Sequence, residues 1–395
     1  MVLAPIDAAV NESQSNCARS FSLRRLDLTD FRNFSRLRLE TDSRPVVLVG
    51  KNGVGKTNIL EAISCLSYGR GLRRARLFEM AKHTPKLEKK WAVAANIQGL
   101  YGLVSLGVGW SNNENLIESR NKRDFRVNGS SVNSHNTLNE HISIVWMTPA
   151  QDRLFSDSPS GRRHFIDQLV SAFDINHITR IKEFERGRRD RMRILRSNIL
   201  DKNWLDAIEQ GMAERAVAIA AGRLDIVSRL HDEVISIDSK FPCPGVGING
   251  LVEDWLRDMP ALNAEEMYKK QLAEDRSRDR ETGGSVGPHL SDLTATFNRE
   301  GVPASQASTG EQKAILIAIL LAHSRLLAQL RGAPPIMLLD EVVAHLDSNR
   351  RESLFECLLK MGTQAWMTGT DLEFFSGLSN NARYLRVDKS TIKEE

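Results

Sequence analysis

The chain has 395 residues, of which 41% are apolar and 26% are charged, and its formal net charge is +4. This is ordinary globular composition, and the absence of any apolar run near the roughly 18 residues that cross a bilayer argues against a membrane protein. The length suits two domains. The mild positive charge permits a polyanionic partner but does not prove one.

The chain opens on residues 1–20, which have neither a basic start nor an apolar segment. They do not resemble a secretory signal, and we expect a disordered tail. Cysteines are scattered along the rest of the chain without a C-x-x-C pair, which argues against a zinc site and a disulfide framework. We therefore expect a cytoplasmic protein. The cysteines are Cys17, Cys65, Cys243 and Cys357.

A nucleotide-binding pattern follows the tail. Apolar and polar residues alternate from Phe21 to Glu40 with a break at Arg32-Asn33, as in two strands. A short apolar strand, Pro45 to Val49, then leads into a glycine-rich loop, and Asn58 to Ser67 has the pattern of a helix. The order strand, loop, helix is the context that a G-x-x-x-x-G-K-T motif needs. The loop reads Gly50-Lys51-Asn52-Gly53-Val54-Gly55-Lys56-Thr57.

Each part of this loop has a chemical use. Its three glycines let backbone N–H groups turn toward phosphate oxygens, Lys56 offers a charge to the β- and γ-phosphates, and the Thr57 hydroxyl can bind Mg²⁺. A plain turn between strand and helix is the alternative. The complete motif favours nucleotide binding, with ATP and Mg²⁺ as cofactors.

The middle of the chain changes character. Short strands are expected from Trp91 to Val127 and from Ile142 to Met147. From Ser160 to about Ile237 apolar residues recur at helical spacing without proline, which predicts two or three long helices. A charged helix is expected from Ala264 to Arg280, after which Gly283 to Asp292 turns the chain back.

Two further motifs lie near the C-terminus. Ser308-Thr309-Gly310-Glu311-Gln312 precedes an apolar helix, Ala314 to Leu330, and would alone be interpreted as a helix cap. The strand Ile336 to Leu339 ends in Asp340-Glu341, which would alone be interpreted as a solvated turn. Their spacing is that of the signature and acidic motifs of ABC-type ATPases. Asp340 would then contact Mg²⁺, and Glu341 would polarise the attacking water as the catalytic residue.

More than half of the chain separates the glycine loop from its partner motifs, so a large segment is inserted into the nucleotide fold. We predict an α/β P-loop ABC-type ATPase head, with a mixed sheet and flanking helices, carrying an inserted short α-helical arm. The expected boundaries are 21–150 for the N-terminal part of the head, 151–282 for the arm and 283–395 for the C-terminal part of the head.

These motifs together resemble the RecF family of SMC/Rad50-like ATPases, over essentially residues 23–387. The resemblance rests on the signature and acidic motifs and on further segments. These are Leu28 to Phe34, Gly50 to Asn58 with Glu61-Ala62-Ile63, Thr148 to Asp167 including Arg162-Arg163, and Gly287-Pro288-His289. Three departures are present: Thr309 replaces a glycine, Leu290 replaces an arginine, and no switch histidine follows Trp366-Met367-Thr368.

The resemblance implies a head that dimerises around two ATP molecules. Ser308, with Gly310 and Gln312, would reach the γ-phosphate held by the other subunit, and Asp347 matches the D-loop at that interface. Gln151 matches the Q-loop residue that senses Mg²⁺ beside Thr57 and Asp340. The nucleotide would be held by Arg32, Asn33 and the loop residues Gly50, Lys51, Asn52, Gly53, Val54, Gly55, Lys56, Thr57 and Asn58.

Two basic clusters are candidates for DNA contact, because arginine binds phosphate without regard to base sequence. The first, on a loop expected to be exposed, contains Arg70, Arg73, Arg74 and Arg76. The second is Arg180 to Arg196 on the arm, with Arg188 and Arg189 at its centre. Internal ion pairs with Glu183, Glu185 and Asp190 are the alternative for the arm.

Three functions compete. A transporter subunit has its signature much closer to the glycine loop, and a long-coil SMC or nuclease-coupled protein has several hundred inserted heptad residues or a metal cluster. The resemblance favours an ATP-dependent DNA-binding protein of recombinational repair and replication restart, acting on gapped or single- and double-stranded DNA. Its expected partners are a second copy in an ATP-dependent homodimer, RecO- and RecR-like proteins and a RecA-like recombinase, with no membrane. Weak ATP hydrolysis would serve as a switch.

Overall fold

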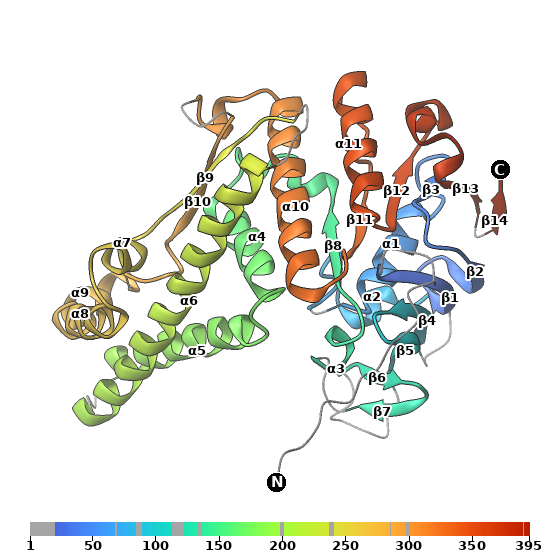
Figure 1. Ribbon diagram of the computed structural model, residues 1–395. Helices are drawn as coiled ribbons and strands as arrows, with labels where there is room; N and C mark the ends of the chain where they lie inside the picture. The colour runs from blue at the N-terminus through green and yellow to red at the C-terminus, as the bar shows by residue number, and fades with distance from the viewer. Residues whose placement is uncertain are drawn as a thin grey trace, which may run out of the picture.

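The computed structural model places a two-sheet head beside a helical arm that extends away from it (Figure 1). The structure describes residues 20–67, 69–83, 89–112, 122–132, 136–197, 201–236, 241–284, 286–297, 301–389 and 391–395. The expected tail, residues 1–20, lies outside the described residues except for its last residue.

The first sheet is antiparallel and has the order β2-β1-β4-β5-β6-β7. Phe31 pairs with Phe34 across the expected break, where Arg32 adopts a φ of 53°. The alternation predicted from Phe21 to Glu40 is confirmed over part of β1 and β2, because Leu26, Leu28, Leu37 and Leu39 are buried while the residues between the members of each pair are not. The strands are β1 (Ser22–Phe31), β2 (Phe34–Glu40), β4 (Lys90–Gly99), β5 (Gly102–Ser111), β6 (Asp124–Val127) and β7 (Ser130–Val132).

The second sheet has the order β14-β13-β3-β12-β11-β8, with β14 antiparallel to β13 and the other neighbours parallel. Strand β3, which leads into the glycine loop, lies between β12 and β13, so both ends of the chain build the head. Its burial on both faces explains its continuous apolar run. The strands are β3 (Val46–Val49), β8 (Ile144–Met147), β11 (Ile336–Leu339), β12 (Ala365–Gly369), β13 (Arg383–Asp388) and β14 (Thr391–Glu394).

Helices complete the two cores of the head. One core packs the inner face of the first sheet against α1 (Lys56–Ser64), and the other packs α10 (Thr309–Arg331) and α11 (Ser348–Met361) against the second sheet. Helix α10 is long and apolar enough to cross a membrane, but 72% of its most apolar window is buried inside the protein. The short helices are α2 (Leu77–Met80), α3 (Asn136–Asn139), η2 (Pro149–Gln151), η3 (Ala304–Gln306) and η4 (Leu372–Asn381).

The arm is built around two long helices, α5 (His177–Arg196) and α6 (Lys202–Ser236), which follow α4 (Pro159–Ser171). The prediction of two or three long helices in this stretch is confirmed. The single helix expected from Ala264 to Arg280 is wrong, because the chain forms α8 (Ala261–Glu274) and α9 (Arg276–Thr282), which meet at Asp275, after α7 (Leu251–Asp258). Strands β9 (Gly245–Asn249) and β10 (Asp292–Thr296) form a two-stranded antiparallel sheet, and they lie on opposite sides of the expected boundary at 282.

A buried ionic cluster joins the arm to the rest of the chain. The Arg223 guanidinium of α6 donates to both carboxylate oxygens of Asp167 on α4, at 2.8 and 2.9 Å, and to the Pro288 carbonyl at 2.6 Å. Gly287 has a φ of +136°, and a Cβ there would lie 2.5 Å from the Tyr268 hydroxyl. A larger residue would therefore break this joint, which explains the glycine.

Candidate functional site: the nucleotide cavity

The glycine loop is braced by the turn between β1 and β2. Helix α1 begins at Lys56, two residues earlier than expected, so the loop opens directly onto a helix N-terminus. The Asn33 amide donates to the Val54 carbonyl at 3.1 Å and accepts from the Asn58 amide at 2.7 Å. A Cβ on Gly55 would lie 2.6 Å from that amide nitrogen, so only glycine fits.

Lys56 is held inside its own loop. Its side chain is buried, and Nζ donates to the carbonyl oxygens of Gly50 and Lys51, the latter at 3.0 Å. Burial lowers the pKa of Lys56, while the charges of Glu341 and Asp340 oppose that change. The ammonium group is therefore already placed on the phosphate side of the loop, and the exposed loop residues are Lys51, Asn52 and Gly53.

Asp340 lies at the end of β11 and is bonded to two threonines. The Thr57 hydroxyl donates to its Oδ1 at 2.9 Å, and the Thr368 hydroxyl at the end of β12 donates to the same oxygen at 2.8 Å. Burial raises the pKa of Asp340, while the hydrogen bonds from Thr368 and Thr57 oppose that change. A buried carboxylate beside a hydroxyl is the oxygen set that Mg²⁺ binds, so these residues fit the metal that the motif implies.

Glu341 is exposed to solvent, while a hydrogen bond holds its backbone in place. Its N–H donates to the Thr368 hydroxyl at 2.7 Å, and its φ is 50°. The residue lines a cavity of about 540 Å³ together with Thr57, Asp340 and Gln151. That volume lies within the range of small-molecule sites.

The other walls of this cavity come from the loop after α1 and from α4. Arg73 and Arg74 line it, as do His164 and Gln168. Both arginines are exposed, as expected, but they face the nucleotide cavity, and Arg73 also donates to the Asn58 side chain at 2.8 Å. Arg70 and Arg76 are exposed and are not part of the cavity lining.

Gln151 and Arg32 are both engaged with neighbouring groups. The Gln151 side-chain oxygen accepts from the Thr148 N–H at 2.8 Å. The Arg32 guanidinium donates to both oxygens of the buried Glu61, at 2.8 and 2.6 Å, and to the Glu79 carbonyl. Arg32 therefore braces α1, and its expected contact with the nucleotide stays a prediction.

The signature motif begins α10 at the surface. Ser308 is its N-cap, and the Glu311 carboxylate accepts from both the N–H and the hydroxyl of Ser308 at 2.8 Å. A Cβ on Gly310 would lie 3.1 Å from the His345 carbonyl, so the signature lies beside the loop that ends at Asp347. Asp347 is the exposed N-cap of α11, where it accepts from the Arg350 N–H at 2.9 Å.

Unlike Ser308 and Asp347, Gln312 is buried. It is 4% exposed, and its amide bonds to the Ser156 hydroxyl at 3.0 Å and the Ala307 carbonyl at 2.9 Å. Its side chain is satisfied within its own subunit and is not offered to a second one in this state.

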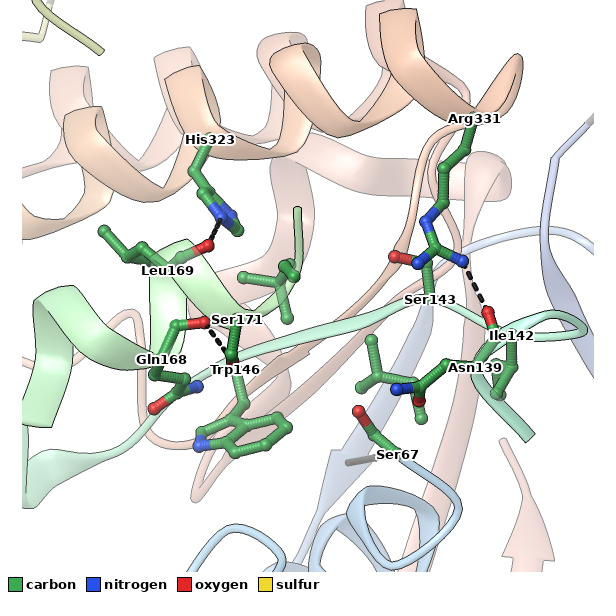
Figure 2. A pocket seen from close by; sticks show the side chains of 13 residues that line it. Ser67, Asn139, Ile142, Ser143, Trp146, Gln168, Leu169, Ser171, His323 and Arg331 are labelled. Carbon is green, nitrogen blue, oxygen red and sulfur yellow. Dashed lines mark hydrogen bonds between the residues drawn. The ribbon is translucent and has the colours of Figure 1, made fainter. Parts of the chain in front are cut away.

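A smaller cavity of about 50 Å³ lies behind the nucleotide cavity, between β8, α4 and α10, and shares Trp146 and Gln168 with it (Figure 2). The His323 ring donates to the Leu169 carbonyl at 3.0 Å on one side, and Arg331 donates to the Asn139 carbonyl on the other. This space holds only a few water molecules. The larger cavity is therefore the candidate nucleotide site.

The basic cluster of the arm contains both ion-paired and solvent-exposed arginines. Arg188 is half-buried and pairs with Glu185 at 3.0 Å, as the alternative interpretation expected. Arg189 is exposed, and Arg186 and Arg193, with side chains 80% and 75% exposed, both reach Asp190. A surface cleft of about 290 Å³ is lined by Arg188, Arg189, Met192, Arg193 and Arg196.

Sequence reasoning missed two residues that hold the site together. Thr368 bonds both Asp340 and the Glu341 N–H, and nothing in its strand pattern marks it. Lys313 is 1% exposed at the start of α10, and the sequence marked it only as a charge that directly precedes a long apolar run.

Known proteins resemble most of the chain. The family model described as the RecF/RecN/SMC N terminal domain matches residues 22–393. The DNA replication and repair protein RecF of Mesorhizobium japonicum is 41% identical over 93% of this chain and 96% of its own length. The chain belongs to the RecF family. The RecF protein of Rhizobium meliloti is also 41% identical, over 92% of this chain and 96% of its own length.

Solved structures agree on the fold. The recombination mediator protein RecF of the RecFOR pathway, solved with ATP, has a TM-score of 0.78 and 22% identity, covering 95% of this chain and all of its own. An SMC head domain from Pyrococcus furiosus has a TM-score of 0.50 and 14% identity, covering 95% of this chain and 96% of its own. The predicted fold class, an ABC-type ATPase head with an inserted helical arm, is confirmed.

Proposed function

We propose that this RecF-family chain is an ATP-dependent DNA-binding protein of recombinational repair and replication restart, and that ATP joins two copies of its head. The observation that carries this proposal is the 540 Å³ cavity that Thr57, the last residue of the glycine loop, lines together with Gln151, Asp340 and Glu341. The signature serine lies in an exposed capping turn of the same subunit.

In the proposed site the loop N–H groups and Lys56 hold the phosphates of ATP. Thr57, Asp340 and Gln151 would hold Mg²⁺, which neutralises phosphate charge when bound. Glu341 orients and polarises the attacking water, since its backbone is fixed while its side chain reaches the cavity. We expect slow ATP hydrolysis, because the proposed function needs the ATP-bound dimer to persist.

The dimer would form through Ser308, Gly310 and Asp347. All three lie on one surface formed by the starts of α10 and α11, whose N-terminal N–H groups and dipoles favour an anion. A γ-phosphate bound to a second subunit supplies that anion.

DNA would bind the outer face of α5. Lys182, Arg186, Arg189, Arg193 and Arg196 are exposed and follow one another at intervals of three or four residues, so they share one face of the helix. Over 14 residues this basic face spans about 21 Å. Four further parts of the proposal rest on the family resemblance alone. They are gapped DNA as the substrate, RecO- and RecR-like proteins as partners, a RecA-like recombinase as a partner, and a cytoplasmic location.

Sedimentation of the purified protein with and without ATP tests this proposal. Glu341→Gln should shift from monomer to dimer with ATP and remain there, while Ser308→Arg should bind ATP and stay monomeric. A Ser308→Arg protein that still dimerises with ATP would show that the signature is only a helix cap.

A further inference from the structure

Helix α10 carries a buried lysine that the proposed chemistry does not use. Lys313 lies five residues after Ser308, and its side chain is 1% exposed. The residues that follow it, from Ala314 to Ala322, are buried and apolar. Burying an ammonium group costs free energy unless an opposite charge and hydrogen-bond acceptors surround it. The groups that contact the Lys313 ammonium therefore indicate the role of this residue.

One of those partners, Glu341, lines the nucleotide cavity, and the other, Asp152, directly follows the lining residue Gln151. The Lys313 ammonium donates to the Asp152 carboxylate at 3.2 Å and to the Glu341 carbonyl oxygen at 2.9 Å. Asp152 directly follows Gln151, and Glu341 is the proposed general base. One side chain therefore joins the signature helix to the Q-loop and to the end of β11.

The backbone of Glu341 needs such support. Its φ of 50° is in the left-handed region, which is unfavourable for any residue with a Cβ. Its N–H donates to Thr368, and its carbonyl accepts from the Ala344 N–H at 3.2 Å as well as from Lys313. Lys313 supplies the charged contact in this set.

We propose that Lys313 is a positioning residue that couples the signature end of α10 to the general base. Five residues of helix place its Cα about 7.5 Å along the axis from Ser308, so the first turn and Lys313 move together. When a second subunit contacts Ser308, the displacement of α10 is passed through the ammonium group to Glu341 and to the Q-loop. This inference rests on the proposed function, because it requires Glu341 as base and Ser308 as the contact in trans.

Removing the lysine alone would leave a buried charge behind. The second Asp152 oxygen is buried without a hydrogen-bond partner, so Lys313→Met can fail to fold for that reason. The decisive variant is therefore the neutral pair Lys313→Met with Asp152→Asn. The matched control is Arg325→Met, which removes a partly exposed cation on the same helix that faces Glu233 at 3.8 Å.

The test measures ATP affinity, ATP-dependent dimerisation, kcat and KM for each protein. The paired variant should fold, bind ATP within about twofold of wild type and dimerise with ATP. Its kcat should fall at least about tenfold with KM unchanged, as expected when a general base is misplaced. Lys313→Arg, which keeps the charge, should recover part of kcat. Arg325→Met should match wild type.

Wild-type kcat in the paired variant, beside an inactive Glu341→Gln, would overturn this inference alone and make the ion pair purely structural. Loss of ATP-dependent dimerisation in the paired variant would also overturn it, because Lys313 would then act on the interface. Turnover that survives Glu341→Gln would overturn the proposed function and this inference with it.

Discussion

The residues proposed to bind Mg²⁺ and to activate water are held together by hydrogen bonds to one carboxylate, that of Asp340. Asp340 Oδ1 accepts from Thr57 and Thr368, and Thr368 in turn accepts from the Glu341 N–H. The glycine loop, the acidic strand and the strand beside it are thus linked through one oxygen atom. A change at any one of these four residues should therefore shift the others.

Lys56 and Glu341 should separate binding from hydrolysis. We expect Lys56→Ala to lose ATP binding, because it removes the charge at the phosphate side of the loop. Glu341→Gln should bind ATP normally and hydrolyse it at least about 100-fold more slowly, the low end for a positioned general base. Nucleotide-binding fluorescence and a phosphate-release assay measure the two effects. Unchanged turnover in Glu341→Gln would remove that residue from the mechanism.

His323 should make stability sensitive to acid. Burial lowers the pKa of His323 to about 4, below the 6.5 of a free histidine. Between these values the unfolded chain binds more protons, so the free energy of unfolding decreases as pH falls from about 6.5 to about 4. His323→Gln, which keeps a donor for the Leu169 carbonyl, should flatten this dependence by up to about 1.4 kcal/mol per pH unit. Urea titrations across that range test it, and identical slopes would contradict it.

At the scale of elements, the sequence patterns predicted which residues of a helix or strand are buried. They were less successful at predicting which partner each side chain contacts. Strand β11 and the break between β1 and β2 follow directly from local periodicity. The partners of Arg32 and Gln312 could not be predicted, because Glu61 and Ser156 lie far from them in sequence. The roles of Arg73 and Arg74 were also hidden, since only the fold places their loop beside Asp340.

The basic face of α5 should carry the salt dependence of DNA binding. If Arg189 and Arg193 contact phosphates, replacing both by alanine should shallow the slope of log affinity against log salt by roughly one to two units. The loss should be similar for different DNA sequences, because phosphate contacts carry little sequence information.

A matched control replaces Lys269 and Lys270, two exposed lysines of α8. Titrations at several salt concentrations should leave this control at the wild-type slope. Wild-type affinity and slope in the arginine variant would place the DNA path elsewhere.

At the scale of the molecule, the C-terminal strands complete the nucleotide site. Strand β13 pairs with β3 from Val46 to Val49, and a Cβ on Gly50 would lie 2.4 Å from the Val387 carbonyl. Ending the chain at Ala382 removes this neighbour and should abolish ATP binding. Ending it at Lys389 removes only β14, which pairs with β13 alone, and should leave binding intact. Equal ATP affinity in both truncated proteins would contradict this expectation.

The position of β3 between β12 and β13 also has a consequence for synthesis on the ribosome. The strand emerges early, while its two neighbours belong to the end of the chain. At about 5 to 20 residues per second, the glycine loop waits roughly 20 to 70 seconds before its sheet can close. During that interval the nascent chain exposes an apolar strand and cannot hold ATP, so we expect it to depend on chaperones until translation ends.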